Sequence, residues 1–518
     1  MLLVYPPVSR SPEPPIGLAR LSGWLRSGGV EARCIDLNQE GLDYLLALSG
    51  SEEVGAPRST DARGLRMATA LRESRTYENF DRYSRAVGEV SKTMRELSSR
   101  AGAIVSLGDY RDPSLSPLRK SDLIRSAEGF EGNVFFPLFE KRLPPEIRRC
   151  ASSGSETTIG ISVCYLSQAL SAFALCGYVR RAFSSSRIIL GGGLITSWLA
   201  CGQLEEDETF DGLVDALLPG PGEASLAAYL GLCEVRLDAA PVFEDFRELP
   251  YFAPSKILPY NFAYGCPWKR CSFCPEAAEG MPYISKDRGA AAREIRELAE
   301  SESPALFHFT DNEVAPAYLR DLASSPPGAP WYGFARFSDF LLDSSACERL
   351  AASGCVMLQL GLESADQGVL EALGKGTRIE EIDRILKNLE AASIAVYLYV
   401  LFGTPAEDRD SALRTRDFIA SRAQRIGFLN LALFNLPASG KEAGELETTD
   451  FYDGDLSLYS EFRHPKGWGR AEARAFLEKD FLSVPELRAI ARRTPPVFTS
   501  NHAPFFLPRM GCGGDQRG

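Results

Sequence analysis

The sequence predicts an α/β protein with two parallel sheets in succession. The first is an N-terminal doubly wound parallel sheet with a helical insertion, the second is a partial barrel of six β/α units, and a small α-rich segment ends the chain. Short apolar runs bounded by turn residues alternate with helical patterns in both parts, which is typical of parallel sheets. The alternation is interrupted over about residues 40–155 and stops after Pro437. We therefore divide the chain into residues 1–240, 241–436 and 437–518.

Composition and charge argue against several classes of protein. A chain of 518 residues, of which 45% are apolar, can form about two to four domains with large cores. Its net charge of −12 argues against a nucleic-acid partner. The longest apolar run near the middle, Ile394 to Gly403, is too short to cross a bilayer, and the N-terminus lacks the charged region of a signal peptide. The twelve cysteines also lack the regular spacing of a secreted disulfide scaffold, so we expect a cytoplasmic protein without a membrane partner.

The first domain opens as a β-α-β unit. Apolar runs predict a strand over residues 2–5, a helix over 16–26 and a strand over 30–37. The insertion that follows is rich in Arg, Glu and Ser, with helices predicted around 61–101 and 120–142. Further strands are predicted at 158–164, 187–190 and 212–217, with a helix from Leu166 to Val179.

Three glycines mark a ligand site in this domain. Gly191, Gly192 and Gly193 follow a predicted strand, and ligands of doubly wound sheets bind at the carboxyl ends of the strands. Without side chains there, a flat or phosphate-bearing ligand can approach the backbone. No Gly-x-Gly-x-x-Gly fingerprint follows the first strand, so a nicotinamide or flavin domain is weakly supported. The alternative is that these glycines only turn the chain in a domain that binds nothing.

From Tyr260 onward, strands and helices alternate every few tens of residues. Strands are predicted at 260–264, 305–309, 331–336, 356–360, 396–402 and 426–434. Helices are predicted at 288–301, 319–323, 344–352, 378–392 and 410–423. Six such units form a partial barrel, and the chemistry of such barrels gathers at the carboxyl ends of the strands.

Three cysteines directly after the first barrel strand form the strongest motif. Cys266, Cys271 and Cys274 lie on one short loop, and three thiolates can hold three irons of a cubane while the fourth iron stays open. A structural zinc site would need a fourth protein ligand, and no nearby Cys or His offers one. We interpret the motif as an iron–sulfur site, with zinc or an incidental cluster as the alternative.

Polar residues gather at the other strand ends. They are Asp311, Asn312, Arg336, Glu363, Ser364, Gly403 and Pro405. An Arg with carboxylates around a cluster loop suits a zwitterionic ligand that carries a ribose. Asp311 could instead cap the next helix, and Arg336 could be an ion-pair partner at the surface. His308, between Phe307 and Phe309, is expected to be a core or channel residue rather than a cluster ligand.

The last eighty residues break the barrel pattern. Thr448 to Trp468 is aromatic and mixed in charge, and Ala471 to Ala491 predicts one or two helices. The apolar end, Phe498 to Phe506, is expected to fold back and close the open side of the barrel. His502 is then either a proton donor or acceptor in a substrate pocket or part of a packed tail.

The cluster loop resembles that of the radical SAM enzymes. Their usual spacing is Cys-x3-Cys-x2-Cys, and this chain has Cys-x4-Cys-x2-Cys, which is similar to a variant found in a cobalamin-domain branch of the superfamily. The resemblance covers roughly residues 245–435 and implies a [4Fe–4S] cluster on the three cysteines, with S-adenosyl-L-methionine (SAM) on its open iron.

The same resemblance assigns SAM contacts to residues at the strand ends. It implies that Phe273 lies beside the adenine, that Asp311 and Asn312 lie near the methionine amino group, and that Arg336 pairs with the methionine carboxylate. Glu363, followed by Ser364, would hydrogen-bond the ribose, and Gly403-Thr-Pro405 would contact the adenine through its backbone. Gly374-Lys-Gly376 is a further family-like stretch to which the resemblance gives no role.

The first domain resembles the cobalamin-binding domain found ahead of radical SAM domains. The resemblance lies in Pro6-Pro7, Ile161-Ser162, Gly191-Gly-Gly193 and Gly220-Pro-Gly-Glu223. It implies cobalamin contacts from Pro7, Ser162, Gly191, Gly192, Gly193 and Glu223. The only histidines are His308, His464 and His502, so no histidine of this domain can be the lower axial ligand.

Together these resemblances imply a cobalamin-dependent radical SAM enzyme. A 5′-deoxyadenosyl radical would abstract hydrogen from an unactivated carbon of a peptide or small natural-product substrate, and cobalamin would deliver a methyl group. An electron donor such as flavodoxin or ferredoxin would reduce the cluster. One alternative is a rearrangement, cyclisation or oxidation without methyl transfer. The other is a non-catalytic corrinoid or iron–sulfur sensor.

Overall fold

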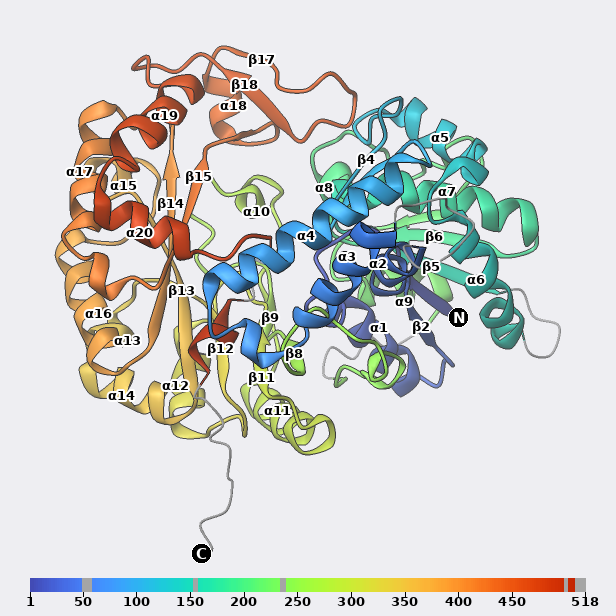
Figure 1. Ribbon diagram of the computed structural model, residues 1–518, viewed down its shortest axis with the longest axis horizontal. Helices are drawn as coiled ribbons and strands as arrows, with labels where there is room; N and C mark the ends of the chain where they lie inside the picture. The colour runs from blue at the N-terminus through green and yellow to red at the C-terminus, as the bar shows by residue number, and fades with distance from the viewer. Residues whose placement is uncertain (49–57, 152–156, 233–238, 498–501, 508–518) are drawn as a thin grey trace, which may run out of the picture.

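The computed structural model describes residues 1–48, 58–151, 157–232, 239–497 and 502–507. It contains the two predicted parallel sheets side by side, with the C-terminal segment over one end of the second (Figure 1). The predicted α/β class, with a doubly wound sheet followed by a partial six-stranded barrel, is confirmed. Within the described residues, no helix combines the length and the apolar character that crossing a membrane requires.

The first sheet has the strand order β2-β1-β5-β6-β7, and all of its strands are parallel. Its strands are β1 (Leu2–Tyr5), β2 (Arg33–Asp36), β5 (Thr158–Ser162), β6 (Arg187–Gly191) and β7 (Ala216–Leu218). Its connecting helices are α1 (Ile16–Ser27), α2 (Leu37–Ala47), α7 (Leu166–Ala182), α8 (Gly193–Ala200) and α9 (Glu223–Leu230). β7 begins later than predicted because Phe210, Asp211 and Gly212 all have positive φ and form a turn.

The side chains of β1 point alternately to the two faces of this sheet, and each face is covered by a hydrophobic core. Leu3 and Tyr5 pack into a core with α1, whereas Leu2 and Val4 pack into a second core with α7 and the insertion. Successive strand residues point to opposite faces, so four consecutive apolar residues require cover on both sides.

The insertion belongs to this second core. It contains α3 (Arg58–Ala70), α4 (Phe80–Ser99), α5 (Lys120–Glu128), α6 (Phe136–Cys150) and a hairpin of β3 (Ile104–Ser106) with β4 (Asp109–Arg111). Each of the two predicted helices is in fact two. The first break lies where Asn79 caps α4 by accepting a hydrogen bond from the Arg82 N–H at 2.9 Å, and the second lies at Gly129. The hairpin was not predicted from the sequence.

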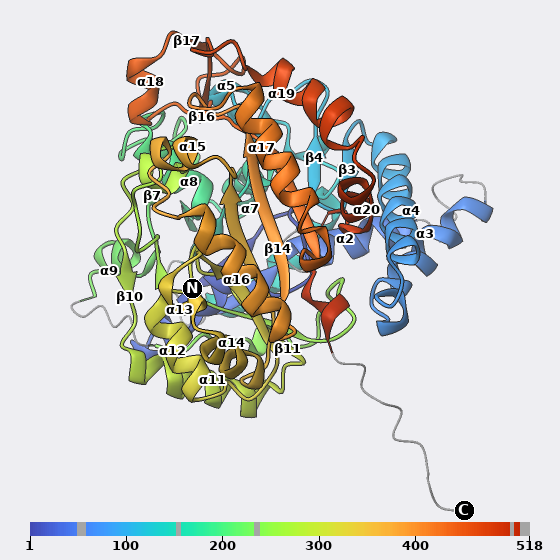
Figure 2. The same ribbon diagram turned by 90° about the vertical axis from the view of Figure 1, so that its left-hand side faces the viewer.

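The second sheet has the order β15-β14-β13-β12-β11-β8 and is parallel throughout. Its strands are β8 (Ile257–Tyr260), β11 (Leu306–Phe309), β12 (Trp331–Ala335), β13 (Cys355–Glu363), β14 (Ala395–Phe402) and β15 (Phe428–Leu433). Helices α11 (Arg288–Glu302), α12 (Pro316–Ser324), α13 (Asp339–Leu342), α14 (Ser344–Ala352), α15 (Gln367–Ala372), α16 (Ile379–Ala391) and α17 (Arg409–Ala420) lie outside it (Figure 2).

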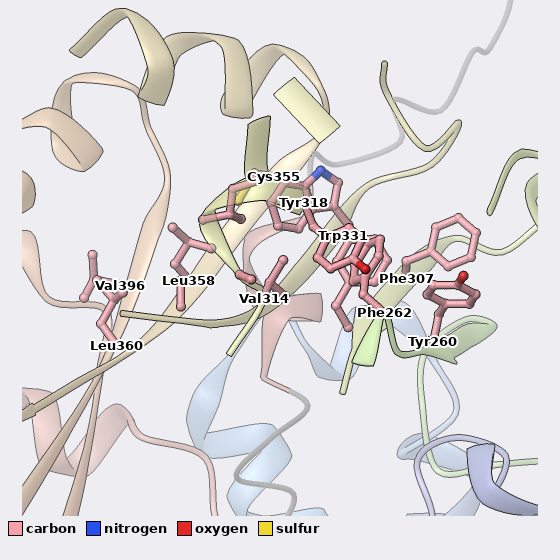
Figure 3. Packing of buried hydrophobic residues seen from close by; sticks show 14 of the residues in the cluster. Tyr260, Phe262, Phe307, Val314, Tyr318, Trp331, Cys355, Leu358, Leu360 and Val396 are labelled. Atoms are coloured by element: carbon pink, nitrogen blue, oxygen red, sulfur yellow. The ribbon is translucent and has the colours of Figure 1, made fainter. Parts of the chain in front are cut away.

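The outer face of the barrel is held by apolar packing against these helices. Leu358 and Leu360 of β13 and Val396 of β14 lie in this core, which continues through Trp331 and Phe262 (Figure 3). Phe262 stacks on Tyr318 of α12 with 4.6 Å between ring centroids. The predicted strand at 260–264 ends early at Tyr260, and the chain continues into β9 (Ala263–Tyr264), which pairs with β10 (Ile284–Ser285).

The C-terminal segment is only partly α-helical. The predicted helices are α19 (Arg470–Phe476) and α20 (Pro485–Arg493), with α18 (Lys441–Glu445) before them. An antiparallel sheet of β16 (Leu436–Pro437), β18 (Tyr459–Phe462) and β17 (Thr448–Asp450) was not predicted, because its strands are short and largely polar. His502 is buried beneath the barrel, stacked on Tyr397 at 5.5 Å, which supports the packed-tail alternative.

A buried ion pair of the first domain forms hydrogen bonds with two residues of the barrel domain. Arg20 of α1 lies 3.3 Å from the Glu223 carboxylate and donates a hydrogen bond to Asn261 at 2.9 Å. The Tyr264 hydroxyl donates to Glu223 at 2.9 Å, and its ring lies under the Arg20 guanidinium at 4.4 Å. Arg20 and Glu223 are 4% and 2% exposed. Removing either side chain would therefore leave the other charge buried and uncompensated.

We predict that Arg20→Met lowers the free energy of unfolding by about 3 kcal/mol, because it leaves the buried Glu223 carboxylate without its cation. The matched control is Glu244→Gln, which removes a partner of Arg26 from an exposed pair and should cost less than about 1 kcal/mol. Urea denaturation followed by circular dichroism measures both. Equal effects of the two substitutions would contradict the role of the buried pair.

Candidate active site between the two sheets

The three cysteines lie on a loop at the carboxyl end of β8. This cluster loop, residues 265–274, runs from β9 to α10 (Pro275–Ala278), which lies between the barrel and the first domain (Figure 1). Cys266, Cys271 and Cys274 are half-buried free thiols. Burial raises the pKa of Cys271 to about 11, although the nearby cations of Lys375 and Arg336 act to lower it.

The donor set of this loop fits an iron–sulfur cluster better than a single metal ion. In the part of the chain that the structure describes, no three His, Cys, Asp or Glu side chains are placed to hold one ion. A cubane instead takes each thiolate on a different iron, which suits three separate thiols. Zinc, the alternative from the sequence, would need such a closed set.

A short segment after α15 packs directly against the cluster loop. This clamp segment, residues 373–376, accepts a hydrogen bond from the Trp268 indole N–H at the Gly374 carbonyl at 2.8 Å. The Ser272 N–H donates to the Leu373 carbonyl at 3.1 Å. Gly376 has φ +66°, and a Cβ there would clash with the Trp268 ring. The Gly-Lys-Gly stretch, to which the family resemblance assigns no role, is therefore a support for the cluster loop.

Arg336 lies at the end of β12 and joins the clamp segment to the loop. Its guanidinium stacks on the Trp268 ring at 3.8 Å, and its Nη2 donates to the Lys375 carbonyl. Its Nε is buried and has no hydrogen-bond partner among the described residues. Arg336 is thus fixed by Trp268 and still has one N–H that can bind an anion.

Lys375 and Glu363 form a second buried pair beside the cysteines. The Lys375 ammonium donates to Glu363 at 2.8 Å and lies 5.5 Å from the centre of the Phe273 ring. Glu363 has φ +60° at the irregular end of β13. Gly361 makes room for the pair, since a Cβ there would come within 2.6 Å of the Lys375 ammonium. The predicted site residues Phe273, Arg336 and Glu363 therefore share one neighbourhood with Lys375.

Asp311, Asn312 and Glu313, which follow β11, differ from one another in burial and in the groups they contact. Asp311 is buried and accepts hydrogen bonds from the backbone N–H groups of Phe262 and Ala263 at 2.8–3.1 Å. These two residues lie where the chain leaves β8 and enters β9. Burial raises its pKa to about 7. The Asn312 side chain is exposed. Glu313, which we did not predict, is buried with its carboxylate 3.8 Å from the Cys266 sulfur. Glu313 could have been predicted from its position, because it directly follows Asp311 and Asn312 after β11.

The remaining predicted site residues are Ser364, directly after β13, and Gly403 and Pro405 in the turn after β14. The Ser364 hydroxyl lies 3.2 Å from that of Thr415 on α17. Gly403 donates its N–H to the buried Glu407 carboxylate at 2.5 Å, and Trp468 donates to the same oxygen at 3.0 Å. Burial raises the pKa of Glu407 to about 7. Pro405 is partly exposed next to this turn.

A cavity of about 430 Å³ joins the first sheet to the cluster loop. This glycine cavity is lined by Ser162 and Gly191–Gly193 on one side and by Tyr264, Gly265 and Glu276 on the other. Gly192 has φ +99°, and a Cβ there would come within 2.6 Å of the Val163 backbone. Four of the six residues predicted to contact cobalamin therefore meet here. Pro7 lies outside the lining, and Glu223 is engaged by Arg20.

A second cavity of about 510 Å³ adjoins the first. This loop cavity lies behind the Pro-rich segment after β1 and reaches His308, Thr310 and Phe334 on the inner face of the barrel. Gly17, Leu18, Ser162 and Cys164 line both cavities. Both cavities follow the carboxyl edge of the first sheet, where ligands of doubly wound sheets bind.

We predict that Gly376→Ala lowers the iron content after anaerobic reconstitution to less than half of that of the unchanged protein, because the added Cβ displaces Trp268 and with it the cluster loop. Gly467→Ala is the matched control, since Gly467 has nearly the same φ of +65° but nothing within 4 Å of its Cβ position. Both variants should keep their far-ultraviolet circular dichroism. Full iron content in Gly376→Ala would contradict the support role of the clamp segment.

A comparison with known proteins assigns the barrel to a protein superfamily. Residues 260–419 match the sequence profile of the Radical SAM superfamily. The bacteriochlorophyllide d C-12(1)-methyltransferase of Chlorobaculum tepidum is 27% identical over 173 residues, which is 32% of this chain and 38% of the relative. The anaerobic magnesium-protoporphyrin IX monomethyl ester cyclase of Rubrivivax gelatinosus is 26% identical over 252 residues, 45% of this chain and 44% of the relative. The chain thus spans less than half the length of these curated relatives.

Solved structures extend the likeness in fold beyond the matched domain. The radical SAM methyltransferase TsrM from Kitasatospora setae, with tryptophan substrate and a SAM analogue bound, is similar over 94% of this chain and 88% of that one, with a TM-score of 0.53 and 15% identity. The cobalamin-dependent SAM radical enzyme OxsB, with aqua-cobalamin bound, is similar over 93% of this chain and 67% of that one, with a TM-score of 0.53 and 12% identity. With the cysteine loop and the six-stranded parallel barrel, the profile match shows that residues 260–419 form a radical SAM domain.

Proposed function

We propose that this radical SAM enzyme is cobalamin-dependent and methylates an unactivated carbon of a peptide or small natural-product substrate. The observation that carries the proposal is the glycine cavity, because Gly191–Gly193 of the first sheet and Tyr264, Gly265 and Glu276 beside the cysteines line the same space. A corrinoid bound there would lie next to the cluster loop. The bound ligands of the two similar structures, SAM analogue or aqua-cobalamin, support this reading.

Three cofactors belong to the proposal. Cys266, Cys271 and Cys274 would hold a [4Fe–4S] cluster, and Ser162 with Gly191, Gly192 and Gly193 would hold the corrinoid. When bound, the cluster with SAM supplies a 5′-deoxyadenosyl radical, and the corrinoid supplies a methyl group that can be transferred to carbon. An electron donor such as flavodoxin or ferredoxin would reduce the cluster.

The charged residues around the cluster loop suit SAM. Arg336, fixed on Trp268 with its Nε lacking a partner in the described chain, would pair with the methionine carboxylate. Glu363, oriented by Lys375, would hydrogen-bond the ribose. Because the Asp311 carboxylate is occupied by two backbone N–H groups, the exposed Asn312 is the better candidate for the methionine amino group.

Adenine contacts would come from apolar side chains and backbone. Phe273 would lie beside the ring, and the turn from Gly403 to Pro405 would offer its backbone. Gly403 is held by Glu407, whose other hydrogen-bond donor is Trp468 of the C-terminal segment. The C-terminal segment therefore takes part in shaping the proposed adenine site.

A second candidate function is a radical rearrangement, cyclisation or oxidation without methyl transfer. It is favoured by the cyclase of Rubrivivax gelatinosus, whose similarity covers more of this chain than that of the methyltransferase. The two candidates differ in whether the SAM methyl group leaves SAM by transfer. With methyl-labelled SAM, label in the corrinoid extracted from reduced protein supports methyl transfer, and a corrinoid that stays unlabelled while SAM is cleaved favours the second candidate.

We predict that Cys271→Ala abolishes formation of 5′-deoxyadenosine from SAM under reducing conditions, while bound corrinoid stays within about twofold of the unchanged protein, because the glycine cavity does not include this thiol. Cys150→Ala, a half-buried free cysteine on α6, is the control and should keep full SAM cleavage. Chromatography of the quenched reaction and the visible spectrum measure the two quantities. If the unchanged protein binds corrinoid but does not cleave SAM, the enzyme proposal fails in favour of a sensor.

A further inference from the structure

We propose that Glu13 and His308 form a recognition pair that accepts a hydrogen bond from an N–H or O–H group of a flat, mostly apolar substrate in the loop cavity. The inference rests on the proposed function, since it names the part of the substrate that would be held beside the glycine cavity. It concerns residues that neither the sequence motifs nor the SAM site use.

The pair bridges the two domains. Glu13 comes from the Pro-rich segment after β1, and His308 comes from β11 of the barrel, 295 positions later in the chain. One Glu13 oxygen lies 2.7 Å from the His308 Nδ1, and the side chains are 14% and 7% exposed. Two polar side chains from different domains meet here in a nearly closed space, and both line the loop cavity.

His308 is fixed in one orientation. Its ring lies flat on the Tyr332 ring, with 4.4 Å between centroids and 3° between planes. In the neutral imidazole whose Nδ1–H is donated to Glu13, the Nε2 carries the lone pair and is an acceptor. Tyr332 thus covers one face of the His308 ring and Glu13 occupies its Nδ1. The Nε2 would be the atom that accepts from a ligand.

The hydrogen-bonding capacity of the site is incomplete. The second Glu13 oxygen is buried and has no partner among the described residues, and the same holds for the Tyr332 hydroxyl under His308. Buried polar atoms of this kind are normally paired with protein, water or ligand. A carboxylate oxygen accepts only, so a ligand that binds to it must bring a donor.

The walls of the loop cavity define the rest of the ligand. Phe334 and Tyr165 line it, and Tyr165 is 56% exposed, although large apolar rings are rarely exposed elsewhere in the described chain. The volume of about 510 Å³ is in the range of small-molecule sites. These walls suit a flat ring, and the Glu13–His308 pair suits an N–H or O–H group on the edge of that ring.

The position of the pair fits substrate rather than cofactor. The loop cavity shares Ser162 and Cys164 with the glycine cavity but includes none of the three cluster cysteines. A molecule held by His308 would therefore adjoin the proposed corrinoid without occupying the cluster loop.

The test compares indole, which is flat and has one N–H donor, with 1-methylindole, which keeps the ring and lacks the donor. Isothermal titration calorimetry on the reconstituted full-length protein should show indole binding about tenfold more tightly, the ratio expected for one hydrogen bond to a charged or polarised acceptor. Glu13→Gln and His308→Phe should reduce this preference to less than about twofold and leave the affinity for 1-methylindole unchanged. Glu348→Gln, an exposed residue of α14, should keep the preference.

Retained tenfold preference in both variants, or no preference in the unchanged protein, would overturn the proposal. Uncoupled SAM cleavage in the same preparations separates this result from the fate of the proposed function, because the pair does not touch the cysteines. Loss of preference with normal SAM cleavage supports the recognition pair. If His308→Phe fails to fold, Glu13→Gln decides, since its site is a loop and its substitution preserves shape.

Discussion

The buried Arg20–Glu223 pair with Tyr264 is the interaction on which the arrangement of the whole site depends. Arg20 belongs to the first helix of one sheet, and Tyr264 lies two residues before the first cluster cysteine. Near this contact, the carboxyl edge of the first sheet and the cluster loop line one seam between the two domains. Both cavities lie along this seam. If each sheet binds a ligand at this edge, as we propose, the two ligands would share one space.

Within this seam, the cluster loop is held by backbone and ring packing rather than by regular structure. Trp268 is enclosed between the Arg336 guanidinium and Gly376, and Lys375 places its charge next to Glu363 and Phe273. Positive charges close to thiolates favour the ionised form that binds iron. The same cations could bind an anionic part of SAM. Support of the loop and recognition of SAM would then share the residues of the clamp segment and the end of β12.

The sequence predicts those features that depend on local patterns. Strand ends and the cysteine loop are local, and the six barrel strands follow from apolar runs such as Val396 to Phe402. Features that depend on distant partners were not predicted. Nothing in the local sequence indicates that Arg20 pairs with Glu223 or that Glu13 meets His308. The polar strands β17 and β18 lack an apolar alternation that would reveal them.

Measuring iron and corrinoid per chain shows whether the protein holds both an iron–sulfur cluster and a cobalamin. The chain would be produced without oxygen and with cobalamin supplied, and its iron and cobalt would be measured per chain together with the visible spectrum. We expect about four irons and about one corrinoid, since the cluster loop and the glycine cavity are separate sites in one chain. Iron without corrinoid would contradict this expectation, because the first sheet would then be a scaffold and not a cofactor domain.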